Sequence, residues 1–311
     1  MSLETTCCSR AGLLEFCVPQ TRFLVGDVGV GGQPGARPTV LIGSIFYHGH
    51  SVVVDESRGE FDRDEAAKRI GLQAEWSGRT GNPCMLDVVG ATPEAIRRHL
   101  EFAAQTTSSP LLIDGTTVEV RRAGLRYVAE AGLGQRVVYN SVQPGIRDEE
   151  LRAIEEAGVA TALVLTYCLS DFTSNGRVAA VRELWPRLQQ AGIRQAMIDT
   201  CVMDLATLGQ AYAAIYAVKA ELGLPAGGGV HNAVAMWRGL KKKMGPEAAG
   251  PCAAAGAAAA LAVGADFLLY GPVEDAPIIF PAVAMIDTAL SQLAIERGAR
   301  PEPRHPRFLI G

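Results

Sequence analysis

The feature that most constrains this fold is a unit that recurs along the chain: an apolar run, a turn, and an amphipathic helical stretch. Eight apolar runs have the pattern of strands, at 39–45, 84–89, 111–114, 136–140, 161–167, 195–199, 227–232 and 266–271. Helical patterns follow them, including 93–105, 118–131, 148–157, 176–191, 205–222 and 251–264. Strands that alternate with helices favour a parallel sheet. Eight such units predict an α/β fold of the (β/α)8 TIM barrel type, with an open doubly wound sheet as the structural alternative.

The segment before the first unit has a different character. Residues 1–15 are expected to form a flexible leader, and residues 16–36 contain two short β segments with glycines that supply the bends. No change in composition marks a second domain. We therefore predict an N-terminal β-hairpin cap over 16–36 and a single barrel over 37–311.

Composition narrows the classes of partner and the compartment. The net charge of −4 gives no electrostatic reason to expect binding to nucleic acid. The Ala-rich run at 253–263 is too short to span a membrane, and the N-terminus lacks the pattern of a signal peptide. The cysteines, at 7, 8, 17, 84, 168, 201 and 252, form no Cys-x-x-Cys pair, so no disulfide framework or thiolate metal cage is predicted. A cytoplasmic protein is expected.

Polar residues end or closely follow five of the expected strands. They are Asp87, Asp114, Asn140, Asp199 and Asn232. The C-terminal ends of barrel strands form the active-site face, so these side chains either converge in one pocket or cap the helices that follow. Asp114 and Asp199 precede further turn residues that are able to cap a helix themselves. This arrangement favours the pocket.

The chemistry of this set suits one class of ligand better than another. A divalent cation draws its ligands within about 2.0–2.6 Å, whereas these residues are spread over five strands. A reduced pterin presents its 2-amino group and N3–H as a flat pair of donors, which one carboxylate accepts side by side. An amide is able to donate and accept along the remaining ring edge. The set therefore favours a pterin over a metal.

Several segments carry a resemblance to a known family. They include GGQPGARPTVLIGSIFY (31–47), GEFDRDEA (59–66), TGNPCMLDVVGATPEA (80–95), LLIDGTT (111–117), VVYNSV (137–142), AIYAVKAELGLPAGGGVHN (214–232) and DFLLYGPVEDAPIIFPAVAMID (266–287). They closely resemble the H subunit of tetrahydromethanopterin S-methyltransferase and its bacterial relatives that use tetrahydrofolate. The resemblance runs from about residue 23 to 305. It implies a pterin-binding barrel of the dihydropteroate synthase type that is active as a homodimer.

The resemblance also assigns roles to individual residues. Methyltetrahydrofolate:corrinoid protein methyltransferases share an Asp, an Asn, an Asp and an Asn after the third, fourth, sixth and seventh strands, which match Asp114, Asn140, Asp199 and Asn232 here. By that resemblance the first three hold the pterin ring and Asn232 lies nearest N5. Asp87 or Asp199 is a plausible charge partner that favours protonation of N5. Asn232 and Asp199 are thus the expected catalytic residues.

The resemblance implies a methyltransferase that moves a methyl group between N5 of tetrahydrofolate or tetrahydromethanopterin and the cobalt of a corrinoid. The chain lacks the Asp-x-His-x-x-Gly loop that usually holds a base-off corrinoid, so a separate corrinoid protein is implied. A dihydropteroate synthase-like pterin enzyme and a non-catalytic binding subunit are alternatives. His231 is expected to be a packing residue, because strand alternation would point it away from Asn232. The basic run Lys241 to Lys243 contacts either solvent, a cofactor tail or a partner.

Overall fold

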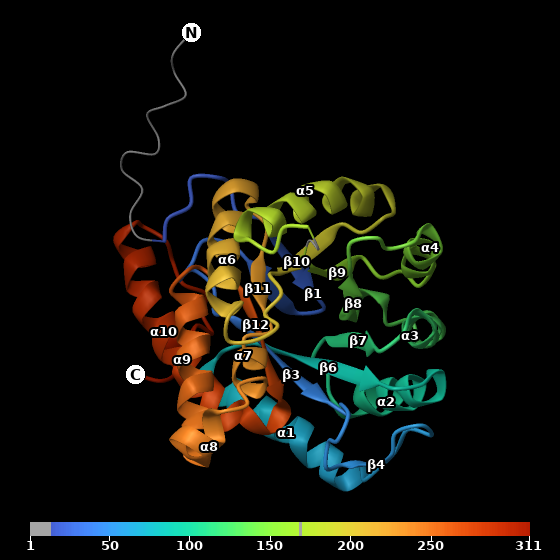
Figure 1. Ribbon diagram of the computed structural model, residues 1–311. Helices are drawn as coiled ribbons and strands as arrows, with labels where there is room; N and C mark the ends of the chain where they lie inside the picture. Colours follow the sequence, from blue (N-terminus) through green and yellow to red (C-terminus); the bar gives the residue numbers. More distant parts are fainter. Residues whose placement is uncertain (1–13, 168–169) are drawn as a thin grey trace.

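The computed structural model describes residues 14–167 and 170–311. Most of the expected leader, together with Cys7, Cys8 and Cys168, lies outside the described residues. Eight strands pair in parallel and close into a barrel, which confirms the predicted fold (Figure 1). In chain order they are β3 (Val40–Ile45), β6 (Cys84–Gly90), β7 (Leu111–Gly115), β8 (Val137–Val142), β9 (Thr161–Leu165), β10 (Gln195–Asp199), β11 (Ala226–Gly228) and β12 (Phe267–Pro272).

Helices follow the barrel strands and surround the sheet (Figure 1). The α-helices are α1 (Arg63–Thr80), α2 (Pro93–Thr106), α3 (Val118–Glu130), α4 (Asp148–Glu156), α5 (Ser174–Gln190), α6 (Leu208–Leu222), α7 (His231–Ala235), α8 (Leu240–Met244), α9 (Ala249–Leu261) and α10 (Ala276–Glu296). The short 3₁₀ helices are η2 (Gly134–Arg136), η3 (Pro246–Ala248), η4 (Val273–Asp275) and η5 (Pro306–Phe308). The insertion of α7 and α8 before α9 makes the region after β11 the most elaborate of the strand-to-helix connections.

Local sequence explains where the helices next to the site begin. The hydroxyl of Thr92 accepts a hydrogen bond from the Ala95 N–H at 3.1 Å, and Pro93 occupies the first position of α2. Thr117 accepts in the same way from Val120 at the start of α3. Threonine caps and an N-terminal proline stabilise helix starts because they satisfy or remove amide donors that lack helical partners.

Alternate residues of each strand point into the barrel. Residues of the opposite parity, such as Leu41 and Leu86, pack between the strands and the surrounding helices. The inward-pointing residues form a buried apolar layer that consists of Val40, Ile42, Met85, Leu112, Val138, Leu163, Met197, Phe267 and Leu269. The interior is therefore a packed core at this level, and side chains two positions further along a strand continue toward its C-terminal end.

A two-stranded hairpin closes the N-terminal end of the barrel. Its strands are β1 (Arg22–Val25) and β2 (Val28–Gly31), which pair antiparallel. Val25, Val28 and Val30 pack against the interior apolar layer. The position of the hairpin agrees with the expected cap, whereas the division of the chain into domains stays a prediction.

The seventh strand is shorter than the sequence pattern predicts. The expected strand ran over 227–232, but β11 ends at Gly228 and α7 begins at His231. The backbone at Gly227 approaches β12 so closely that an added Cβ would lie 2.0 Å from the Phe267 carbonyl oxygen. His231 and Asn232 therefore lie on a helix, so the expectation that strand alternation separates their side chains is wrong.

A second small hairpin lies between β3 and α1. It consists of β4 (Val53–Asp55) and β5 (Glu60–Phe61), which were not among the predicted strands. His50 anchors the loop before it, because its Nδ1 accepts a hydrogen bond from the Phe46 N–H at 3.0 Å. Nε2 then carries the proton and donates to Glu274 at 2.7 Å. This contact links the loop after β3 to η4, which follows the neighbouring barrel strand β12.

One helical segment, Val273–Glu296, is long and apolar enough to cross a membrane by length and composition alone. In the structure it contains α10, which follows the last barrel strand and packs against α1 and α9. Asp287 on α10 accepts hydrogen bonds from the Thr39 N–H at 2.9 Å and from Asn82 Nδ2 at 2.6 Å. These buried contacts make α10 part of the outer ring of the barrel.

Candidate active site

A polar layer lies above the apolar layer inside the barrel. Each of its members stands two residues beyond an apolar interior residue, so all of them share the inward parity. They are Ser44, Asp87, Asp114, Asn140 and Asp199, which follow Ile42, Met85, Leu112, Val138 and Met197. Four of the five predicted site residues thus converge at the C-terminal ends of the strands. This is the end at which barrel enzymes carry their active sites.

Asp87 is the centre of a hydrogen-bonded group within this layer. Ser44 Oγ donates to Asp87 Oδ2 at 2.8 Å, and Asn140 Nδ2 donates to Asp87 Oδ1 at 3.0 Å. Asp114 lies on β7, between the strands that carry Asp87 and Asn140, and pairs in register with Asn140. Burial raises the pKa of Asp87 to about 6. Burial also raises the pKa of Asp114 well above its usual range, and the negative charge of Asp87 adds to this effect.

Asp199 ends β10 and shapes the loop that follows. Its Oδ1 accepts a hydrogen bond from the Cys201 N–H at 2.8 Å, and Cys201 adopts a left-handed φ of 60°. Burial raises the pKa of Asp199 to about 6, although the Cys201 hydrogen bond and the charge of Arg177 oppose this rise. Arg177 lies 1% exposed at the start of α5, where Nη2 donates to the Cys201 carbonyl at 3.2 Å. Cys201 therefore contacts Asp199 through its N–H and Arg177 through its carbonyl, so the guanidinium stabilises the turn that follows Asp199.

Asn232 reaches the same loop from α7. Its Nδ2 donates to the Val202 carbonyl at 2.9 Å, which leaves Oδ1 as an acceptor. A Cβ on Gly228 would lie 3.1 Å from Asp199 Oδ1, and one on Gly229 would lie 3.1 Å from Asn232 Nδ2. Glycines at these positions leave room beside both side chains. Asp199 and Asn232 therefore flank one short stretch of backbone.

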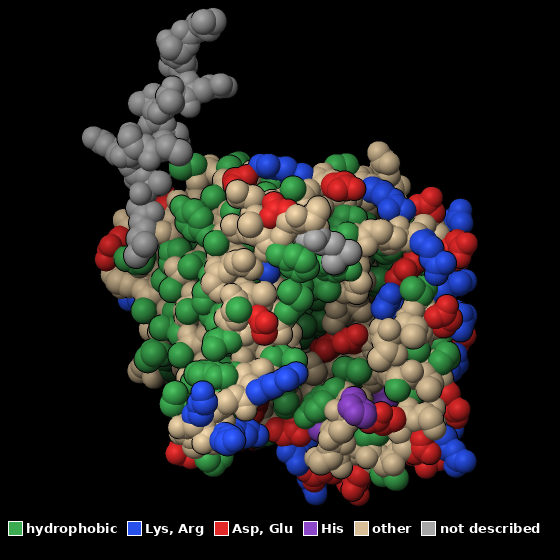
Figure 2. Space-filling view, in the orientation of Figure 1, with side chains coloured by type: hydrophobic (Ala, Val, Ile, Leu, Met, Phe, Trp, Pro, Cys, Tyr) green, Lys and Arg blue, Asp and Glu red, His purple; other side chains and the backbone are tan. Residues whose placement is uncertain are grey.

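The helix-cap alternative for the predicted residues does not hold in the described structure. The side chains that cap α2, α3 and α5 belong to Thr92, Thr117 and Thr173. The residues at the N-caps of α4, α6 and α7 make no side-chain cap hydrogen bond. None of these helix starts uses one of the five predicted residues as its cap. Red acidic side chains are visible in a hollow near the middle of the face in Figure 2.

Two residues of this region were missed in the sequence. Ser44 carried a usable signal, because it is the polar residue two positions after Ile42 in an otherwise apolar strand. Arg177 carried none, since a charged residue in the first turn of an amphipathic helix usually faces solvent. In the structure its guanidinium is buried, and Nε and Nη1 have no hydrogen-bond partner among the described residues.

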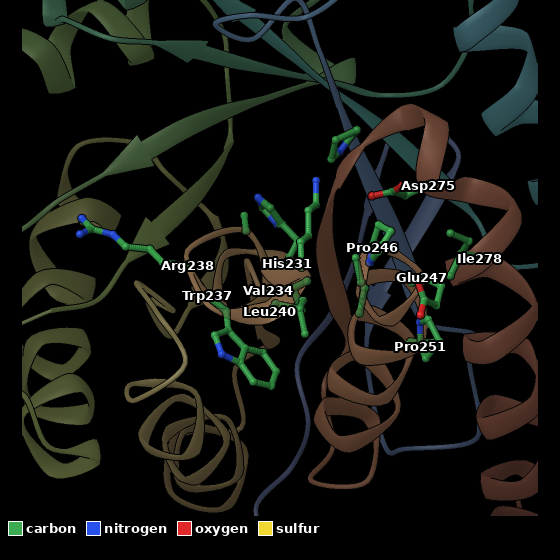
Figure 3. A pocket seen from close by; sticks show the side chains of 17 residues that line it. His231, Val234, Trp237, Arg238, Leu240, Pro246, Glu247, Pro251, Asp275 and Ile278 are labelled. Atoms are coloured by element: carbon green, nitrogen blue, oxygen red, sulfur yellow. The ribbon is translucent and has the colours of Figure 1, made fainter. Parts of the chain in front are cut away.

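A cavity of about 950 Å³ opens beside the polar layer, between α7 and α8 on one side and α9 and the start of α10 on the other (Figure 3). His231 forms part of its wall, and its Nδ1–H donates to the Leu269 carbonyl at 2.9 Å. The side chains of His231 and Asn232 thus contact different elements. His231 is therefore a wall residue of the cavity, and Lys241 of the basic run lines the cavity as well.

The thiols in the described part of the chain lie in different segments of the fold. Cys84, Cys201 and Cys252 are unlinked. Residues 14–167 and 170–311 contain no group of three or more His, Cys, Asp or Glu side chains placed to hold a metal ion. The expectation that the protein needs no metal stays a prediction.

Comparison with known proteins identifies the family. Residues 19–302 match the family described as the tetrahydromethanopterin S-methyltransferase MtrH subunit. The chain belongs to this family. The corresponding subunit of tetrahydromethanopterin S-methyltransferase from Methanothermobacter thermautotrophicus is 39% identical over 309 residues, covering 96% of this chain and 100% of the relative. The one from Methanopyrus kandleri is 37% identical, covering 91% of this chain and 95% of the relative. The resemblance predicted from the sequence is confirmed.

The barrel of this MtrH-family protein is similar to those of solved dihydropteroate synthases. The Yersinia pestis enzyme superposes with a TM-score of 0.61 at 14% identity, covering 86% of this chain and 99% of the enzyme. The enzyme from Thermus thermophilus gives a TM-score of 0.57 at 18% identity, with coverages of 86% and 98%. At these identities the likeness concerns the fold alone. It confirms the predicted dihydropteroate synthase type of barrel.

Proposed function

We propose that this protein transfers a methyl group between N5 of a tetrahydropterin, tetrahydrofolate or tetrahydromethanopterin, and the cobalt of a corrinoid carried by a separate protein. The observation that carries the proposal is the polar layer of three carboxylates, one amide and one hydroxyl at the barrel mouth, in a chain of the MtrH family. The named relatives are subunits of a methyltransferase that acts on tetrahydromethanopterin. Membership of this family favours methyl transfer over the dihydropteroate synthase-like alternative.

The polar layer offers the groups that a pterin ring requires. Asp199 is the carboxylate that accepts the paired donors of the ring, the 2-amino group and N3–H. Asp114 and Asn140 face the remaining edge of the ring. The hydrogen bond from Asn140 Nδ2 to Asp87 fixes the amide, so that Asn140 Oδ1 is presented as an acceptor. Asp87 is thereby a residue that orients Asn140 and contributes negative charge to the site.

Asn232 is the residue proposed to act at N5. When the bond between N5 and the methyl group breaks, N5 must carry a proton, so that the pterin leaves as a neutral amine. An amine anion would be a very poor leaving group. The bond from Nδ2 to Val202 orients the amide, and the oxygen it leaves as an acceptor is able to receive a hydrogen bond from protonated N5. A fixed dipole aimed at a charge that changes during the reaction lowers the barrier. The negative charge of Asp199 favours the same protonated state.

The pH dependence of pterin binding follows from the buried carboxyl group of Asp199, whose pKa is about 6. Only the ionised carboxylate accepts both ring donors, so we expect pterin affinity to be constant above about pH 7. It should fall about tenfold between pH 7 and pH 5, as the carboxyl group takes up its proton. Calorimetric titration from pH 5 to 8 measures this. Affinity that stays level across the range would show that Asp199 does not bind the ring as an anion.

The partners follow from the same chemistry. The corrinoid arrives on a separate protein that docks over the barrel mouth, since this chain lacks the loop that usually holds a base-off corrinoid. The protein is proposed to be a homodimer in the cytoplasm. The named relatives are subunits of a larger methyltransferase, which supports the presence of protein partners.

Purified protein is expected to contain neither a tightly bound corrinoid nor a stoichiometric metal ion. The reasons are the missing corrinoid loop and the absence of a metal-ligand cluster in the described ranges 14–167 and 170–311. Visible absorption spectra and elemental analysis check both expectations. A corrinoid spectrum, or about one zinc ion per chain, would contradict the proposal.

The proposed function is tested first by binding. Calorimetric titrations with methylated and unmethylated tetrahydrofolate, and with the corresponding tetrahydromethanopterins, should show saturable binding of one pterin per chain. The preferred tail identifies the physiological substrate. Absence of binding for all four compounds would refute a pterin site in the barrel.

A further inference from the structure

We propose that the cavity beside the polar layer binds the tail of the tetrahydropterin, namely its aryl group and the start of its anionic chain. The inference rests on the proposed function and extends it from the pterin ring to the substituent at C6. The cavity has a volume of about 950 Å³, within the range of small-molecule sites. The five predicted site residues do not line it, so it is a separate compartment next to the ring.

The two compartments meet at the start of α7. His231 and Asn232 are consecutive residues of this helix, yet His231 lines the cavity and Asn232 contacts the loop after β10. In a tetrahydropterin the tail is attached at C6, the ring atom next to N5. A ring whose N5 lies at Asn232 therefore has its tail attached one bond away from N5, beside the helix whose first residue, His231, lines the cavity.

The lining of the cavity has the chemistry that an aryl group requires. Val234, Trp237 and Leu240 lie on the α7 and α8 side, and Pro251 and Ile278 lie on the side of α9 and α10 (Figure 3). An apolar compartment with an aromatic residue suits a flat arylamine. Gly250, at the start of α9, has no side chain to fill the space in front of Ile278. An added Cβ there would lie 3.2 Å from Ile278 Cδ1.

Charge is distributed unevenly between the two walls. Lys241 lies on the side of α7 and α8, whereas Glu247 and Asp275 belong to the opposite wall, and the guanidinium of Arg238 points away from the cavity (Figure 3). An anionic chain that leaves the aryl group is therefore attracted to one wall and repelled by the other. This assigns a role to the basic run, in which Lys241 lines the cavity and Lys242 does not.

Both candidate pterins share this chemistry. Each carries an arylamine on C6 and ends in anionic groups, carboxylates in folates and phosphate and carboxylates in methanopterins. The cavity is proposed to recognise the part that both tails share, the aryl group, and Lys241 is proposed to attract the anionic groups that lie further along each tail. Binding of the two tailed pterins is therefore compared, so that the preference of the cavity for one tail is measured directly.

The test compares pterins with and without a tail. 5,6-Dimethyltetrahydropterin carries the ring and the N5 methyl group alone, whereas 5-methyltetrahydrofolate and methyl-tetrahydromethanopterin carry the two tails. Wild-type protein should bind at least one tailed compound about 10- to 100-fold more tightly than the tail-free compound, on the scale of burying an aromatic ring. Equal affinity for all three compounds would overturn the inference.

Matched variants locate the effect. Ala254 lines the cavity, whereas the neighbouring Ala255 is exposed and does not. Ala254→Phe should fill the cavity and remove about tenfold of the affinity for the tailed compound, with the affinity for the tail-free compound unchanged. Ala255→Phe should alter neither affinity. Wild-type affinity of Ala254→Phe for the tailed compound would overturn the assignment of the cavity.

A charge-removing pair provides a readout that does not depend on steric fit. Lys241→Gln should weaken binding of the tailed compound about two- to fivefold, and the loss should shrink in high salt. Lys242→Gln removes the same charge from the same helix and should have no effect. Equal effects of the two variants would contradict a specific contact. Failure of all three compounds, with or without a tail, to bind wild-type protein would instead contradict the proposed function itself.

Discussion

Replacing Asn232 with alanine is expected to slow methyl transfer by about 10- to 1000-fold once the pterin is saturating. The variant loses the acceptor oxygen that we propose to face N5, the atom whose charge changes most during the reaction. Pterin affinity should fall less than the rate, because the ring is held mainly by the carboxylate and the amide on β10 and β8. Single-turnover kinetics, followed through the cobalt absorption change, separate the two quantities.

The same variant needs a control for damage to the loop it contacts. Asn232 donates to the Val202 carbonyl, so thermal unfolding and pterin affinity should be measured alongside the rate. A variant that binds pterin normally and turns over slowly supports a role at N5. Wild-type turnover at saturation would make Asn232 a binding residue only, and Asp199 would become the next group to test.

Changing Asp199 to asparagine is expected to weaken pterin binding by about 1.5–3 kcal/mol, or about 10- to 150-fold. The substitution preserves the shape of the side chain and the oxygen that accepts from the Cys201 N–H. It removes the negative charge that pairs with the 2-amino group and N3–H of the ring. Calorimetry at pH 7.5 gives the affinity, and the decline of affinity toward pH 5 should be smaller in the variant, in which Asp87 still titrates with a pKa of about 6.

Asp148→Asn is a matched control for the loss of one negative charge. Asp148 is an exposed residue at the start of α4, paired with Arg187 on the surface. Its replacement should leave pterin affinity unchanged, because surface ion pairs contribute little. Similar losses in the two variants would point to overall charge rather than to a contact of Asp199 with the ring.

The barrel was predictable because its signal repeats. Strands such as β7 are short apolar runs that precede a helix, and several of these helices begin at a side-chain cap such as Thr117. The polar layer was predictable for the same reason. Asp114 and Asp199 interrupt apolar runs at their ends, and side chains at such positions converge once parallel strands close.

Other features depend on contacts that the sequence does not display. The end of β11 at Gly228 and the start of α7 at His231 were not visible in the sequence, because a run of three glycines does not reveal where a strand ends. The burial of Arg177 depends on the turn at Cys201, which follows the next strand of the barrel. The cavity arises from the packing of α7 and α8 against α9 and α10, each of which has an ordinary helical pattern. Local sequence patterns predicted the helices and strands but not these tertiary contacts between them.

The decisive measurement is a single-turnover transfer of an isotopically labelled methyl group. Protein is mixed with tetrahydropterin labelled at its N5 methyl group and with cob(I)alamin, and the cobalt spectrum is followed while the labelled product is isolated. We predict that methylcob(III)alamin forms with the label, in equal amount to the demethylated pterin, and that Asn232→Ala forms it more slowly. Binding of the methylated pterin without any labelled methyl-cobalt product, both with free cob(I)alamin and with a reduced corrinoid protein, would show that the protein is not the methyltransferase proposed here.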